Sequence, residues 1–438
     1  MHILALSRTE RTKAALLSGW FFLTVATLWL LKSLRITELL VHLGARETPY
    51  VRLAGAIVVG VAVLVYSLAA SRLSRVAMVR ATSAIFAALL GAFWVALKIF
   101  GPALAAERAF VWALYVLVDV FAVVMIELFW TYTNDVVTPA EANRLYGVIG
   151  LGGILGGAVG GAVVDLCVRA VGPNDFLLVA AVIVLACAAV GSLTERVLRP
   201  PPRVPKKFES NIDAALEGVH EVARSRYLLL LLGVVIAYEF TATLIDFGVN
   251  VVFERAHLGA TELARMYGRL AWIASIVAIF AQLVLVPLLL PSKHIALLVP
   301  PLVLFASVVG VVVLPVLATA VVMVSVDRGL NYSIQQSTRE SLYVPLTDAQ
   351  KYKAKAFIDM FVDHAAKALA SILLLGLIAI SSASPRVTLL VSCASMIAWI
   401  ACAHRLGLYA KLREAFGTTN SGVSFPSLPP HRAPGTPR

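Results

Sequence analysis

One apolar stretch near the carboxyl end, KAFIDMFVDHAAKALAS, contains Asp359, Asp363 and Lys367 at successive four-residue steps, which places them on one face of a helix. Near the amino end, LWLLKSLRITELL contains Lys32 and Arg35 three residues apart. Lysine and arginine form strong hydrogen bonds with phosphate and carboxylate groups. These cations therefore predict a binding site for a small anionic substrate.

Two further apolar stretches add acidic side chains, Asp119 and Glu127 in one and Glu239 and Asp246 in the other. Each charge alone is equally well explained by an interhelical ion pair, but together they favour a charged central cavity. We predict substrate contacts at Lys32, Arg35, Glu127, Asp246 and Lys367. Residues predicted to take part in coupling or gating are Asp119, Glu239, Asp359 and Asp363.

Aromatic side chains near these charges are candidates for stacking on a nucleobase. We assign this role to Trp130 and Tyr132, with Trp29 and Tyr238 as further candidates. Aromatic residues in membrane helices more often serve in packing or as interface anchors. The acid and base at 327–328 end another apolar stretch, where a gate salt bridge or a place at the membrane interface is expected.

The elements that position these residues are membrane-spanning helices. The chain of 438 residues is 60% hydrophobic and 14% charged, whereas soluble domains are about 25% charged. About 20 apolar residues cross a bilayer as a helix. We therefore predict an all-α polytopic membrane protein with twelve spans, near 14–34, 50–70, 78–99, 109–132, 146–168, 176–194, 227–250, 267–290, 294–312, 314–334, 356–380 and 386–408.

Lysine and arginine are concentrated in alternate loops, which indicates the orientation of the chain. The N-terminal segment, the loop 195–226 and the C-terminal segment are all basic. Both termini are thus predicted to face the cytoplasm, in a bacterial cytoplasmic (inner) membrane. The net charge of +12 follows from this asymmetry, so the lipid bilayer, and no nucleic acid, is the expected partner.

A long polar segment divides the chain into two halves of similar length. We predict an N-terminal six-helix half at 1–195, a cytoplasmic linker with an amphipathic helix at 196–226, a C-terminal six-helix half at 227–410 and a disordered cytoplasmic tail at 411–438. The echoes HLGA (42–45 and 257–260) and EANRLYG beside ELARMYG favour duplicated halves. This is the organisation of major-facilitator transporters, with a substrate site midway between the halves.

The glycine-rich stretch GVIGLGGILGGAVGG, residues 147–161, is part of the fifth predicted span. A dinucleotide-binding fingerprint requires a preceding strand, whereas here a membrane helix precedes the stretch. Gly153, Gly157 and Gly161 recur at four-residue steps, a pattern typical of closely packed membrane helices. We therefore predict a helix-packing role for these glycines, and expect no bound phosphate.

The sequence does not suggest an enzyme. It contains no phosphate-binding loop of the Walker type, no metal-ligand spacing and no catalytic triad arrangement. The four cysteines are scattered within predicted spans. We expect no catalytic residues, no metal and no cofactor.

The segment IELFWTYTNDVVTPAEANRLYGVIGLGG, residues 126–153, resembles the span-four to span-five signature of the ATP/ADP translocase (nucleotide transporter) family. LWLLKSLRITELL and YVPLTDAQKYKAKAFIDMFVDHAAK resemble two further segments of that family. The resemblance implies nucleotide exchange, with the family's transport charges at Arg35, Glu127, Asp246 and Lys367. Arg35 stands where the family usually has lysine, and Asp246 where it has glutamate.

Three functions remain open from the sequence. The first is a secondary transporter that exchanges nucleotides or related phosphorylated anions by alternating access, working as a monomer. The second is a proton-coupled transporter or exporter of another small molecule, with Asp119, Glu127 or Asp246 as the proton carrier. The third is a non-transporting membrane scaffold or sensor, which the charges within spans of both halves disfavour.

Overall fold

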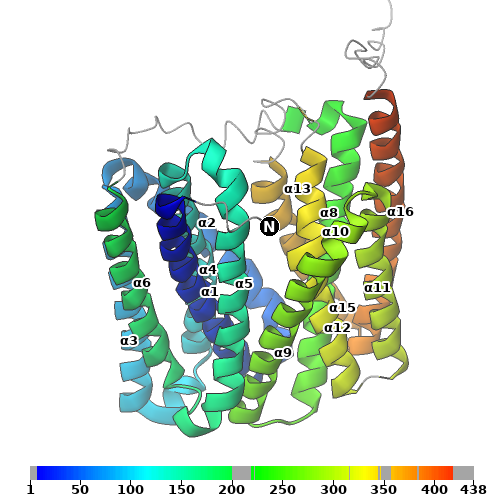
Figure 1. The fold of residues 1–438 in the computed structure, drawn as a ribbon. Coiled ribbons are helices and arrows are strands. Elements are labelled where there is room, and N and C mark those ends of the chain that lie inside the picture. The colour runs from blue at the N-terminus through cyan, green and yellow to red at the C-terminus, as the bar shows by residue number, and fades with distance from the viewer. Residues whose placement is uncertain are drawn as a thin grey trace, which may run out of the picture.

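The computed structural model describes residues 7–199, 219–220, 222–314, 316–343, 346, 357–381 and 384–417. Within these ranges the chain forms helices and short connections, without strands. The helices lie side by side in one bundle (Figure 1). This follows from the long apolar runs, since a backbone in lipid must satisfy its hydrogen bonds internally.

The first set of helices, here called the N-half, comprises α1 to α6. Its elements are α1 (Arg8–His42), η2 (Ala45–Glu47), α2 (Thr48–Arg72), α3 (Arg75–Ala105), α4 (Arg108–Val136), α5 (Pro139–Val171) and α6 (Phe176–Leu198).

The second set, the C-half, includes three crossings that are interrupted by π-helical turns. Its elements are α8 (Arg226–Arg255), α9 (Ala260–Phe280) with η3 (Ala281–Leu285) and α10 (Val286–Leu289), α11 (Lys293–Val313), α12 (Leu317–Leu330) with η4 (Asn331–Gln335) and α13 (Gln336–Tyr343), η5 (Phe357–Val362) with α15 (Asp363–Ser381), and α16 (Pro385–Gly417).

The predicted all-α bundle is confirmed. In the described part of the chain, ten helices are long and apolar enough to cross a membrane. The segments α12–η4–α13 and η5–α15 are further helical stretches of the bundle, at the places of two more predicted spans. Side chains such as Ile380, 87% exposed, lie on the outside of the bundle, where lipid would cover them.

Some predicted boundaries differ from the structure. α16 continues to Gly417, beyond residue 410, where the sequence predicts the C-terminal half to end. The rest of the predicted tail, and most of the predicted linker helix, lie outside the described residues. Pro300 and Pro301 lie within α11 and do not end it.

Each half has its own hydrophobic cluster. One is built on aromatic and aliphatic side chains of α1, α3, α4 and α6, with Trp20 and Phe129 fully buried. The other is centred on α8 and includes Phe247 and Trp399. Most of each core lies within one half, although Leu40 and Ala45 of the N-half join the second cluster.

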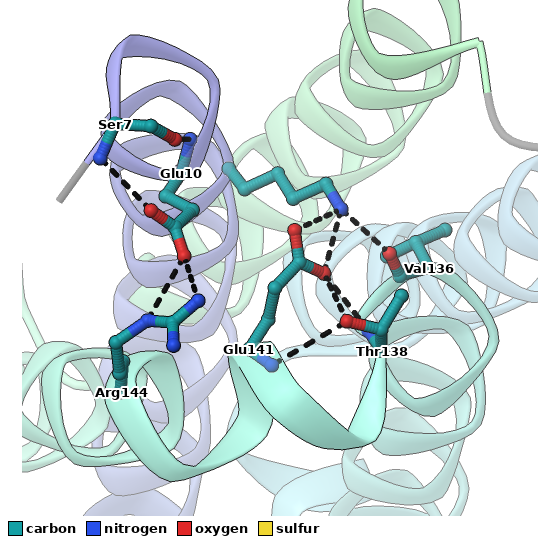
Figure 2. Close-up of polar contacts among 7 residues, drawn as sticks. Ser7, Glu10, Val136, Thr138, Glu141 and Arg144 are labelled. Carbon is teal, nitrogen blue, oxygen red and sulfur yellow. Dashed lines mark hydrogen bonds and ion pairs between the residues drawn. The ribbon is translucent and has the colours of Figure 1, made fainter.

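The starts of α1 and α5 are joined by a reciprocal arrangement of capping residues (Figure 2). Glu10 and Glu141 each complete a capping box at the start of their own helix. Each also binds a cation of the other helix: Glu10 binds Arg144, and Glu141 binds Lys13 at 2.9 Å. Burial raises the pKa of Glu141, but the Thr138 N–H and the Lys13 ammonium outweigh it and hold that pKa below its ordinary value.

Candidate functional site

A cavity of about 520 Å³ lies between the N-half and the C-half. Its wall comes from α1, α2 and α4 on one side and from α8, α9, α12, η4 and α15 on the other. Among the described residues, the charged side chains that line it are the basic Lys32, Arg35, Arg52, Arg328 and Lys367 and the acidic Asp119, Glu239, Asp246 and Asp327. The volume lies within the range of small-molecule sites, about 300–1,000 Å³.

Several of these charges are held in ion pairs. Within the N-half, Arg35 binds Asp119 and lies over the ring of Tyr115. Between the halves, Arg52 Nη2 lies 3.0 Å from Asp246 Oδ2.

In the C-half, Lys367 Nζ lies 3.3 Å from Glu239 Oε2 and 2.7 Å from Asp363 Oδ2. Glu239 is largely buried, and a buried carboxylate needs such a partner. Here, and at Asp119 and Asp246, the acid already neutralises a nearby cation before any substrate binds.

Two cations of the cavity are differently placed, each close to the indole ring of Trp29. Lys32 Nζ lies 5.1 Å from the ring centre, and Arg328 Cζ lies 5.5 Å from it. In the described structure Lys32 has no carboxylate within ion-pair distance. Arg328 has one such carboxylate among the described residues, that of Asp246, whose Oδ1 lies 3.6 Å from Arg328 Nη2. A ring face attracts a cation without cancelling its charge. Lys32 on α1 and Arg328 on α12 therefore present the least neutralised positive charge in the cavity, one from each half.

The structure brings together most of the predicted charged residues. Lys32, Arg35, Asp246 and Lys367 line the cavity, as do Asp119 and Glu239, and Asp363 contacts it through Lys367. Trp29 and Tyr238 also line it.

Three predicted residues on α4 lie away from the cavity. Glu127 follows the cavity-lining Val123 by four residues on the same face of α4, but beyond the cavity, where it is exposed and accepts a hydrogen bond from Thr131. Trp130 packs between aromatic rings of the N-half, and Tyr132 is buried and donates to Glu195. Neither ring lines the cavity, so the cavity gives no support to base stacking by Trp130 or Tyr132, which stays a prediction.

Two members of the predicted stripe of Asp359, Asp363 and Lys367 have side chains that the structure describes. η5 forms a π-helical turn up to Val362, and α15 begins at Asp363. Asp363 and Lys367 share a face of α15 and form an ion pair. The side chain of Asp359 lies outside the described ones, so its place in the stripe stays a prediction.

The two halves meet at the lower end of the bundle in Figure 1, where α5 and α9 converge. There Asp165 of α5, 5% exposed, accepts hydrogen bonds from Arg269 Nε and Trp272 Nε1 of α9, each at 3.1 Å. Arg265 of α9 donates to the Asp165 carbonyl at 3.1 Å. At the upper end, the pairs Lys13–Glu141 and Glu10–Arg144 each join two helices of the N-half. The halves are thus bound to each other below the cavity.

The glycines of α5 lie against two different neighbours. A side chain at Gly152, Gly156 or Gly160 would meet the backbone of α1, and one at Gly153 would meet Phe21 of α1. A side chain at Gly161 would lie 2.7 Å from the Gly268 carbonyl and from Trp272 N of α9.

Gly157 lies between the two neighbours, near Trp29 of α1 and Ser275 of α9. One glycine ridge therefore packs within the N-half, while the end of the other packs across to the C-half.

Sequence reasoning missed two important charges, Arg52 and Asp165. Both lie within apolar stretches, which is the same signal that identified the other charges. Arg52 is close to the start of its span, where an interface position is the usual explanation. Asp165 is near the end of α5, and its partners on α9 are about 100 residues away in sequence.

A charged cavity between two sets of helices that meet at one end is the fold of a class of membrane transporters, the major facilitator transporters, and similarity to a solved member confirms the predicted major-facilitator-like fold. The model is similar in fold to the solved nucleoside transporter NupG, with TM-score 0.64 and 11% identity over 90% of this chain and 99% of that chain. It is also similar to an auto-inhibited POT family peptide transporter, with TM-score 0.62 and 13% identity over 91% of this chain and 97% of that chain.

Within this class, the chain belongs to the TLC ATP/ADP transporter family, whose model matches residues 100–326 and 299–409. It is 26% identical over 316 residues to ADP,ATP carrier protein 1 of Chlamydia pneumoniae, which covers 61% of this chain and 60% of that protein. It is 24% identical over 340 residues to ADP,ATP carrier protein 1 of Chlamydia muridarum, which covers 67% and 64%. The chain thus spans less than two thirds of the length of these relatives. The family is one of transporters and not of enzymes, and the resemblance seen in the sequence is confirmed.

Proposed function

We propose that this protein is a secondary active transporter that exchanges nucleotides or related phosphorylated anions by alternating access. The observation that carries the proposal is the pair of cations Lys32 and Arg328, which face the cavity from opposite halves. A phosphate group supplies several acceptor oxygens and can bind both cations at once. The relatives named ADP,ATP carrier proteins support nucleotides as the substrates.

The remaining charged residues of the cavity form ion pairs with one another around this site. Asp119, Asp246 and Glu239 hold Arg35, Arg52 and Lys367 in place and keep the cavity from being excessively positive when it is empty. Binding of a phosphate releases part of this pairing, because the substrate oxygens compete with the carboxylates for the same cations. The Arg52–Asp246 pair joins the halves, so substrate binding there would change how they are held.

We further propose that the protein lies in a bacterial cytoplasmic membrane with both termini in the cytoplasm, as the basic loops indicate. With that orientation, the seal at Asp165 is periplasmic and the structure is inward-facing. Rocking of the N-half against the C-half would open the Asp165 end and close the other. Each half has its own core, which supports motion as two units and function as a monomer.

The experiment that tests this function is counterflow in proteoliposomes. Vesicles containing the purified protein are loaded with unlabelled ADP or left empty, and uptake of labelled ATP, ADP, AMP and inorganic phosphate is measured. Uptake of labelled nucleotide that requires internal nucleotide is the expected result. Uptake that is equal in empty and loaded vesicles would contradict exchange, and uptake of phosphate alone would contradict a nucleotide substrate.

Variants then test the site itself. Hydrogen bonds to charged groups contribute about 1.5–3 kcal/mol, so Lys32→Gln and Arg328→Gln should each raise the KM for nucleotide about 10- to 150-fold. Arg108→Gln is the matched control, since Arg108 is exposed at the lower end and pairs with Glu47 within the N-half. Unchanged KM in both cavity variants would refute the assignment of Lys32 and Arg328.

A further inference from the structure

One carboxylate of the cavity differs from the other three. Asp327 on α12 lines the cavity, is 7% exposed, and its Oδ1 accepts no hydrogen bond from the described residues. No arginine or lysine in the described ranges forms an ion pair with it. The other three acidic residues each have a basic partner, in the pairs Arg35–Asp119, Arg52–Asp246 and Lys367–Glu239.

The groups that face Asp327 do not replace such a partner. Its charged neighbours are Asp246 of α8, an acid, and the adjacent Arg328 of α12, whose guanidinium lies toward Trp29 and Asp246. The phenols of Tyr238 on α8 and Tyr332 in η4 also lie within electrostatic range. In the described parts of α9 and α11, which also pack against α12, no charged side chain faces it.

A carboxylate in this position is poorly stabilised when ionised. Burial removes water from the charge, and a nearby acid repels it, so the neutral, protonated form is favoured. A phosphate bound at Lys32 and Arg328 would add further negative charge next to Asp327. The proton and the anion therefore favour each other's binding, and such coupling is reciprocal.

We propose that Asp327 is the proton-binding residue of the cavity, and that it takes up one proton when an anionic substrate binds at Lys32 and Arg328. This inference rests on the proposed function, which places a nucleotide in this cavity. It assigns the proton to a residue other than Asp119 or Asp246, each of which is already paired with an arginine. The transported species is then the anion together with a proton.

The test is calorimetric titration of the purified protein with ATP in two buffers that differ in ionisation enthalpy, which gives the number of protons bound per nucleotide. The wild type is compared with Asp327→Asn, which has the shape of the protonated residue. The titration of the ATP phosphate itself, near pH 6, is common to both proteins and cancels in the difference. Asp175→Asn, outside the cavity, is the matched control.

The wild type is expected to take up about one proton more per ATP than Asp327→Asn, in the pH range where Asp327 titrates. In that range its affinity for ATP, relative to that of the variant, falls about tenfold per pH unit. The Asp175→Asn protein should behave as the wild type.

Equal proton uptake by the wild type and Asp327→Asn would overturn the role of Asp327 and leave the nucleotide site intact. Absence of ATP and ADP binding by the wild type at every pH would instead refute the proposed function. Should Asp327→Asn fail to fold, the wild type alone decides: proton uptake no larger than that expected from ATP itself overturns the inference.

Discussion

Asp165→Asn should open the end of the bundle where α5 and α9 meet. The carboxylate accepts two hydrogen bonds from Arg269 and one from Trp272, all across the interface between the halves. Asparagine keeps the shape but loses the charge and one acceptor oxygen.

The size of the effect follows from the geometry. Each hydrogen bond to a charged group contributes about 1.5–3 kcal/mol when desolvated. The Arg269 side chain is 43% exposed, so water screens part of this energy. We expect a net loss of about 2 kcal/mol from the closed state, which is about a 30-fold change in the ratio of closed to open molecules.

The assay is pulsed electron spin resonance between spin labels on Ala106 of the N-half and Val313 of the C-half, both exposed near the lower end. The native cysteines are first replaced. Asp165→Asn should add or enlarge a population with a longer distance between the labels.

The control is Glu47→Gln, which breaks an ion pair of 2.9 Å with Arg108 at the same end but within one half. It should leave the distance distribution unchanged. The reasoning is refuted if Asp165→Asn matches the parent protein, or if Glu47→Gln shifts the distances equally.

Three further outcomes are expected. Gly161→Val should also favour the open lower end in the same spin-label assay, because its side chain would meet the α9 backbone at 2.7 Å; a larger closed population would contradict this. Lys367→Ala should lower the thermal stability of the purified protein, because it leaves Glu239 buried without a cation, and adding Glu239→Gln should restore part of it. If the double variant were no more stable than Lys367→Ala, the pairing would have no stabilising role. The Lys98 and Trp94 donors lower the pKa of Asp175. The stability that they add is therefore present above about pH 4 and is lost as the pH falls further. Asp175→Asn removes this contribution, so the thermal stability of the variant should fall less than that of the wild type below about pH 4.

The sequence by itself determined the class of fold and the kind of site. Long apolar runs can exist in lipid only as helices, so their number and length predict the all-α bundle. Charges within such runs are costly, so Lys32, Arg35, Asp246 and Lys367 stand out without any structure. The signature at 126–153 predicted the family, which the family match confirms.

Only the tertiary structure decided which of these charges are neutralised and which remain available. Arg52 and Asp246 are 194 positions apart in sequence, and nothing local in either segment predicts their contact. Trp130 and Tyr132 are close to the charges in sequence, but the packing of α4 against α1 sets their rings against Phe21 and Trp20, away from the cavity.

The glycines of α5 show the same division. Their spacing predicts close helix packing, but not the identity of the neighbour. The structure assigns Gly156 and Gly160 to α1, in the same half, and Gly161 to α9, in the other. A helical repeat specifies a face of one helix, whereas the partner of that face is decided by the arrangement of all the helices. For that reason the cavity, the seal at Asp165 and the lack of a basic partner for Asp327 among the described residues could be found only in three dimensions.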